Sequence, residues 1–101
     1  MISKYLERRV ELKHEEGICN DGIELEYYLI ESEPKQFEEN FGGKVYGIEI
    51  VKKAKESSIE SKIIRNLSYD RQNTHNMVCY LAENIVTPVE LSFVLDDLMG
   101  V

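Results

Sequence analysis

Hydrophobic and polar residues alternate through the first two thirds of the chain, which is the pattern of half-buried β-strands. The segment ISKYLERRVELK has a largely charged side and an apolar side formed by Ile2, Leu6, Val10 and Leu12. The segment IELEYYLIE alternates in the same way and follows the turn signal Asn20-Asp21-Gly22, whose residues tolerate positive φ. The two segments therefore predict a β-hairpin.

Two further segments, KVYGIEIVKK and IESKIIRNLS, predict a third and a fourth strand. Gly47 lies inside the third strand, where glycine often marks a bulge or a close approach of another backbone. The segment before it, SEPKQFEENFGGK, breaks the alternation and places Phe37 four residues before Phe41. This spacing allows one helical turn with both rings on one side, or a loop with two aromatic anchors.

The last third of the chain changes to a helical period. Ser68 or Asp70 can cap a helix from about Arg71 to Asn84, with an apolar stripe at Met77, Val78, Leu81, Ala82 and Ile85. Thr87, Pro88 and Glu90 then form the start signal of a second helix with a capping box. Gly100 ends that helix, and its adjacent acids Asp96 and Asp97 are predicted to point into solvent.

Four strands followed by two helices predict an α+β fold: a four-stranded antiparallel sheet with two C-terminal helices packed on one face, in a single domain over residues 1–101. The alternation makes both faces of the sheet apolar. One face is predicted to carry Leu25, Tyr27, Leu29, Val45 and Val51. The opposite face is predicted to carry Tyr28, Ile30, Tyr46, Ile48 and Ile50.

Two short helices can cover only one of these faces. The second face needs another cover, either the segment 32–44 or a second protein molecule. The set Tyr28, Ile30, Tyr46, Ile48 and Ile50 is therefore the predicted interface with a partner.

The composition narrows the partner class. The 101 residues carry a formal net charge of −7, which argues against nucleic acid and against an anionic membrane surface as partners. The N-terminal segment lacks the apolar core of a signal peptide, and no apolar run is as long as a membrane span. The two cysteines, Cys19 and Cys79, form no disulfide framework or CxxC motif, so we expect reduced thiols in a bacterial cytoplasm.

The chain resembles a family of small uncharacterised proteins from clostridia and related Gram-positive bacteria. The resemblance rests on the YYLIE strand, on the VYGIEI strand with Tyr46-Gly47-Ile48, and on the helix pair joined at Val86-Thr87-Pro88 and followed by Leu91 and Asp96 or Asp97. It covers roughly residues 27–99. The resemblance implies this fold, and it brings neither an activity nor catalytic residues.

A first group of residues with potential chemistry is His14, Glu15, Glu16 and Cys19. Imidazole and thiolate suit zinc. One His and one Cys beside a turn are a weak signal for a metal site, and charged residues are expected there in any case. The sequence therefore favours no metal and no cofactor.

A second candidate is the pair His75 and Cys79, which are four residues apart and can share one face of the first helix. A Cys–His pair can activate a thiolate, but a free cysteine is also common core material. Asp70 and Asn76 are near in sequence, yet the spacing positions neither of them to orient the imidazole. The sequence therefore favours a protein that is not an enzyme.

We accordingly expect a cytoplasmic interaction or regulatory protein that associates with a second copy, as a homodimer, or with another protein. The alternative is a small-ligand or anion-binding protein. Such a site would use the Phe37–Phe41 loop, or the helix start near Arg71 with support from Lys62 and Arg65. No glycine-rich phosphate loop precedes that helix start.

Overall fold

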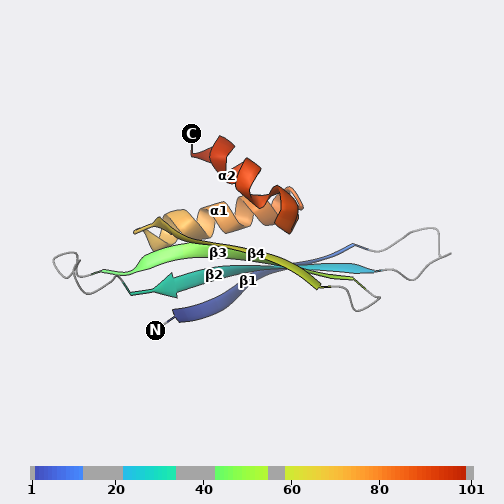
Figure 1. Cartoon of the computed structure of the whole chain (residues 1–101), viewed down its shortest axis with the longest axis horizontal. Helices are drawn as coiled ribbons and strands as arrows, with labels where there is room; N and C mark the ends of the chain where they lie inside the picture. The colour runs from blue at the N-terminus through green and yellow to red at the C-terminus, as the bar shows by residue number, and fades with distance from the viewer. Residues whose placement is uncertain (1, 13–21, 34–42, 55–58, 100–101) are drawn as a thin grey trace.

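The computed structural model describes residues 2–12, 22–33, 43–54 and 59–99 (Figure 1). Its elements are β1 (Ile2–Leu12), β2 (Ile23–Ser32), β3 (Val45–Ala54), β4 (Ile59–Ser68), α1 (Arg71–Glu83), the short 3-10 helix η2 (Pro88–Glu90) and α2 (Leu91–Leu98). Each predicted strand and the first predicted helix are present within about two residues of their expected bounds. The second predicted helix begins at Pro88 as the 3-10 turn η2 and continues as α2 from Leu91.

The four strands form one sheet in the order β1-β2-β3-β4, and each strand is antiparallel to the next. Figure 1 shows both helices on the same side of this sheet, with α1 against it and α2 farther away. The α+β prediction with helices on one face is therefore confirmed. The buried core between sheet and helices consists of Leu25, Tyr27, Ile48, Ile50, Val78, Leu81, Ala82, Val86, Leu91 and Leu95.

A β-bulge interrupts β1 at Glu7. Leu6 lies opposite Tyr28 and Arg8 lies opposite Tyr27, so Glu7 is one extra residue in β1. Because successive side chains of a strand point to opposite faces, the insertion reverses the alternation beyond it. Val10 therefore lies on the helix-covered face while Leu6 lies on the other face. The predicted apolar side of this strand, which joined residues on both sides of the bulge, is wrong.

The pairing of β2 with β3 corrects the predicted interface. Ile48 lies opposite Leu29 and Ile50 lies opposite Tyr27, and residues directly opposite each other share a face of the sheet. Both isoleucines are fully buried in the core under the helices. The prediction that placed them on the second face with Tyr28 and Ile30 is therefore wrong.

Three further residues of the predicted faces are assigned by the same register. Tyr46 lies opposite Glu31 on the helix-covered side, whereas Val45 lies opposite Ser32 and Val51 lies opposite Glu26 on the far face. Relative to the second strand, the prediction thus placed each of these three residues on the face opposite to the one it occupies. Of the five predicted interface residues, Tyr28 and Ile30 remain on the far face.

Gly47 permits a close approach of β3 and β4. The register between these strands shifts between Tyr46 and Ile48, and Asn66 in the irregular part of β4 has a φ of 59°. A Cβ added at Gly47 would lie 2.3 Å from the carbonyl oxygen of Ile64. The predicted close backbone approach at this glycine is confirmed.

The predicted helix starts are present. Asp70 is the N-cap of α1, and its Oδ1 accepts a hydrogen bond from the Gln72 amide at 3.0 Å. Glu90 closes the predicted capping box, because its carboxylate accepts from the Thr87 amide at 3.1 Å. Asp96 and Asp97 are exposed, as predicted. These residues build helix ends and solvated surface.

Helix α1 ends at Glu83, two residues before Ile85, the last position of its predicted stripe. The Ile85 amide donates to the Ala82 carbonyl and the Val86 amide donates to the Leu81 carbonyl, which is the hydrogen-bond pattern of a Schellman motif. Ile85 occupies the left-handed position of that motif with a φ of 52°, and its side chain is exposed. A β-branched residue is strained in this conformation, where glycine is the usual choice.

We therefore expect Ile85→Gly to stabilise the protein by about 1 kcal/mol, since glycine removes the left-handed strain while the exposed side chain contributes little packing. Urea unfolding monitored by circular dichroism measures the change. Ile85→Val is the matched control, because it keeps the β-branch and should leave the free energy of unfolding nearly unchanged. A lower stability for the glycine variant would contradict this account of the helix end.

Candidate functional site

The sheet face away from the helices is covered largely by its own long side chains. The Lys4 ammonium lies 4.4 Å from the centre of the Tyr28 ring and 3.0 Å from the Glu49 carboxylate. Lys53 pairs with Glu26 at 3.3 Å, and Arg9 pairs with Glu24. Lysine and arginine stems cover apolar surface while their charged ends stay in water. The far face is therefore not a bare apolar surface.

Tyr28 and Glu26 form the polar centre of this face. The Tyr28 hydroxyl donates to the Glu26 carboxylate at 2.7 Å, and Glu26 is only 8% exposed. The hydrogen bond from Tyr28, assisted by Lys53, lowers the pKa of Glu26 below its ordinary value. The same hydrogen bond, together with burial, raises the pKa of Tyr28 to about 12. Both groups therefore keep their ordinary protonation at neutral pH and hold each other in place.

The exposed apolar side chains of the far face lie at the two edges of the sheet. On β1, Ile2 and Leu6 are each 51% exposed, and on β4, Ile59 is 65% and Ile63 is 45% exposed. The register places Ile59 opposite Lys53 and Ile63 opposite Glu49, which confirms that both β4 side chains point to the far face. The apolar surface predicted for the middle of the sheet is therefore found at its edges.

The β4 edge is apolar on the helix side as well. An open hollow of about 330 Å³ lies between β4 and η2, and Glu60, Ser61, Lys62, Pro88 and Val89 line it. Val89 is 72% exposed, and Phe93, four residues further along the chain, is 75% exposed. Among the described residues β4 is thus an edge strand with exposed apolar side chains on the far face, at Ile59 and Ile63, and with Val89 of η2 exposed beside it on the helix side.

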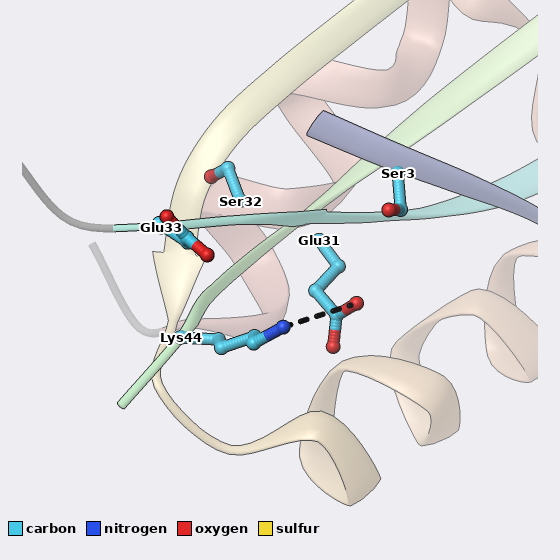
Figure 2. Close-up of a pocket in the computed structure, with 5 residues that line it drawn as sticks. All are labelled: Ser3, Glu31, Ser32, Glu33 and Lys44. Carbon is cyan, nitrogen blue, oxygen red and sulfur yellow. Dashed lines mark ion pairs between the residues drawn. The ribbon is translucent and has the colours of Figure 1, made fainter. Parts of the chain in front are cut away.

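A second hollow, shown in Figure 2, lies at the end of the sheet between β1, β2 and the start of β3. Its volume of about 40 Å³ suits a water molecule rather than an organic ligand. Lys44 points to Glu31 across it at 3.9 Å, and the hydroxyls of Tyr5 and Tyr46 donate to the same carboxylate. Glu31 and Lys44, two of the charged residues that line this hollow, are therefore already paired with each other.

The described residues of the predicted ligand sites lie in different parts of the structure. The N-terminal amide of Gln72 is bonded to the Asp70 carboxylate, which would repel an anion, and Arg71 lies over the Tyr5 ring at 5.4 Å. Lys62 belongs to the β4 hollow, and Arg65 lies in the irregular part of β4. The Phe37–Phe41 loop and the group His14, Glu15, Glu16 and Cys19 lie outside the described residues.

A cluster of four side chains joins β1 to α1. His75 Nδ1 lies 2.6 Å from Glu7 Oε1, and His75 Nε2 lies 3.5 Å from Cys79 Sγ. Arg8 Nη2 donates to the same sulfur at 3.4 Å. The predicted shared face of His75 and Cys79 is thus confirmed as a contact. The carboxylate thus contacts the imidazole, the imidazole contacts the thiol, and a guanidinium lies beside the sulfur.

The sequence interpretation missed Glu7 and Arg8. It looked for an Asn or Asp near the imidazole in sequence, whereas Glu7 comes from a strand 68 positions earlier. The available signal was the run Glu7-Arg8-Arg9, where three consecutive charged residues interrupt the alternation of the first strand. Such an interruption is typical of a β-bulge, and bulges are frequent beside functional sites.

In the described parts of the chain, no group of three or more His, Cys, Asp or Glu side chains has an arrangement that could hold a metal ion. None of the helices found there has the length and apolar character needed to cross a bilayer.

By its fold the chain is a small α+β protein in which two C-terminal helices cover one face of a four-stranded antiparallel sheet. It belongs to a family of unknown function, DUF6514, whose model matches residues 6–101. The match confirms the resemblance to an uncharacterised family, and the occurrence in clostridia stays a prediction. No curated protein and no solved structure matches the chain.

Proposed function

We propose that the protein is a non-enzymatic association module, and that it binds a second copy of itself through the outer edge of β4, beside which no further strand lies among the described residues. The observation that carries the proposal is the exposure of apolar side chains on both sides of this edge, with Ile59 at 65% and Val89 at 72%. An exposed strand edge offers unpaired backbone donors and acceptors to another strand. The surface is therefore the strand edge rather than the middle of the sheet.

The residues of β4 suit antiparallel pairing with an identical strand. If the pairing is centred on Ser61, Ile59 of one copy lies opposite Ile63 of the other, on the far face. The same register places Glu60 opposite Lys62 on the helix side, so that two pairs of opposite charge flank the centre. A two-fold axis repeats each contact, which is the arrangement of most homodimers.

The hollow beside β4 supports the same pairing. A two-fold axis perpendicular to the joined sheet keeps the helices of both copies on one side. The hollows of the two copies, each lined by Lys62, Pro88 and Val89, then face each other across the interface, and apolar side chains of one copy are buried against those of the other. Backbone pairing of the strands and burial of apolar side chains thus stabilise the same interface.

Charge reversal tests the register. Lys62→Glu places like charges opposite each other twice, and we expect the dissociation constant of the dimer to rise about tenfold. The double variant Glu60→Lys, Lys62→Glu restores opposite charges with exchanged positions, and we expect it to recover most of the affinity. Sedimentation equilibrium or light scattering over a concentration series measures the constant.

An apolar-to-charged change tests the surface itself. Ile63→Lys should abolish dimerisation and leave the monomer folded, because Glu49 lies directly opposite position 63 and pairs with the new charge. Ile2→Lys is the matched control, since Ile2 is a similarly exposed isoleucine on the opposite edge strand. A wild-type protein that stays monomeric, or a dimer insensitive to position 63, would contradict the proposal.

The alternative of a small-ligand or anion-binding protein has less support. Its helix-start site is capped by the Asp70 carboxylate, and the hollow of Figure 2 contains a paired Glu31. The helix start and this hollow thus give little support to ligand binding, and the Phe37–Phe41 loop lies outside the described residues.

A further inference from the structure

We infer that Cys79 is a site of thiol–disulfide exchange and that its reaction partner is a small disulfide. His75 carries the proton, Glu7 orients the His75 ring, and Arg8 donates the hydrogen bond that holds the sulfur. The inference is independent of the proposed association. It rests on the four-residue cluster between β1 and α1, whose three contacts are 2.6, 3.5 and 3.4 Å long.

The contact between Glu7 and His75 fixes the ring. When Nδ1 carries the proton, its N–H donates to the Glu7 carboxylate, and the lone pair of Nε2 faces Cys79 Sγ. A nucleophile next to a base, with the base oriented by a third group, is the arrangement that activates thiols and hydroxyls in many proteins. Glu7 touches only the imidazole, so it is a positioning residue.

The bulge in β1 brings two of the four groups to the sulfur. In a regular strand, Glu7 and Arg8 would point to opposite faces of the sheet. Because Glu7 is the inserted residue, both side chains reach α1, one to His75 and the other to Cys79. Bulges commonly redirect a side chain in this way beside a functional site.

The surroundings of Cys79 suit a small reagent. The thiol is partly exposed, and it lies where α1 packs against β1. A low-molecular-weight disulfide needs only an accessible sulfur and a proton carrier.

The exchange step is balanced in atoms and electrons. The thiol proton of Cys79 passes to His75 Nε2, and Sγ attacks one sulfur of the disulfide R–S–S–R. The new Sγ–S bond forms as the S–S bond of the reagent breaks. The leaving thiolate takes the proton from His75, and the products are a mixed disulfide on Cys79 and one R–SH. Cys79 is oxidised, and the departing half of the reagent is reduced.

The experiment uses the full chain with Cys19→Ser, so that Cys79 is the only thiol. The probe is 5,5′-dithiobis(2-nitrobenzoic acid), an aromatic disulfide whose released thiolate is coloured. We expect a second-order rate at least tenfold above that of the same protein unfolded in urea, and a single mixed-disulfide adduct in the mass spectrum. A rate at or below that of the unfolded chain would overturn the inference.

Variants separate the roles. His75→Ala should slow the reaction about tenfold, and free imidazole should restore part of the rate, which a purely structural role of His75 would not allow. If that variant does not fold, His75→Gln gives the same loss of rate without a cavity. Glu7→Gln keeps the shape of the side chain and should slow the reaction several-fold while the melting temperature stays unchanged. Rates unaffected by both His75 and Glu7 would overturn the inference.

Discussion

Replacing Gly47 by alanine is expected to destabilise the protein by at least about 3 kcal/mol, because the new Cβ would lie 2.3 Å from the Ile64 carbonyl oxygen and 2.9 Å from Arg65 Cα. Both neighbours are backbone atoms of β4, so no side-chain rotation can make room. Either β4 moves away from β3 or their pairing is lost. Since domains of this size are stable by only about 5–15 kcal/mol, the change removes a large part of the total.

Gly22→Ala is the matched control for Gly47→Ala. A Cβ at Gly22 would meet only the Leu12 carbonyl oxygen at 3.9 Å, an ordinary contact. We expect this variant to leave the free energy of unfolding within about 1 kcal/mol of the wild type. Urea unfolding curves of the three proteins measure the difference. Equal stability of the two alanine variants would contradict the close approach of β3 and β4.

Replacing Tyr27 by alanine is expected to cost about 3–5 kcal/mol, since the ring is fully buried in the core. Its hydroxyl also donates to the Val86 carbonyl at 2.8 Å, which ties the sheet to the segment between α1 and η2. Burial, with the nearby charge of Glu90, raises the pKa of Tyr27 to about 12, so the hydroxyl stays a donor at neutral pH. Tyr27→Phe removes this bond alone and should cost about 1 kcal/mol.

The neighbouring residue supplies the control for Tyr27. Tyr28→Ala changes the same side chain one position further, on the partly solvated far face of the sheet. We expect it to cost clearly less than Tyr27→Ala in the same denaturation experiment. If Tyr28→Ala proved the more destabilising variant, the assignment of the core to the helix-covered face would be wrong.

The consequence of Gly47 for function lies at the edge of the sheet. The close approach and the irregular segment at Asn66 confine the register shift to the C-terminal half of β4. From Ile59 to Ile64 the strand pairs regularly with β3. This regular part is the one that carries the proposed association, whereas the irregular part leads into α1.

Local patterns in the sequence determined which elements form and where they begin and end. Strands appear where apolar and polar residues alternate, and helices begin at Asp70 and after Thr87, because a cap needs only a side chain within three residues of a free amide. The spacing of His75 and Cys79 likewise determined their contact, since residues four apart on a helix are neighbours.

Only the tertiary structure decided which faces of neighbouring strands coincide. A shift of one residue in the pairing turns every side chain of a strand to the opposite face. The sequence alone does not show which residues between β2 and β3 form the connection, so it does not fix the pairing register. Ile48 and Ile50 were therefore assigned to the wrong face of the sheet. Their pairing with Leu29 and Tyr27 is fixed by the core that forms once the helices pack.

The cluster at Cys79 likewise depends partly on the local sequence and partly on the tertiary structure. His75 and Cys79 come from one helix, and their contact follows from helical geometry alone. Glu7 and Arg8 reach them only because one extra residue in β1 redirects two side chains and because α1 packs across that strand. Contacts between distant segments depend on strand register and packing, which no local pattern encodes, so the sequence determined the pair and the fold completed the site.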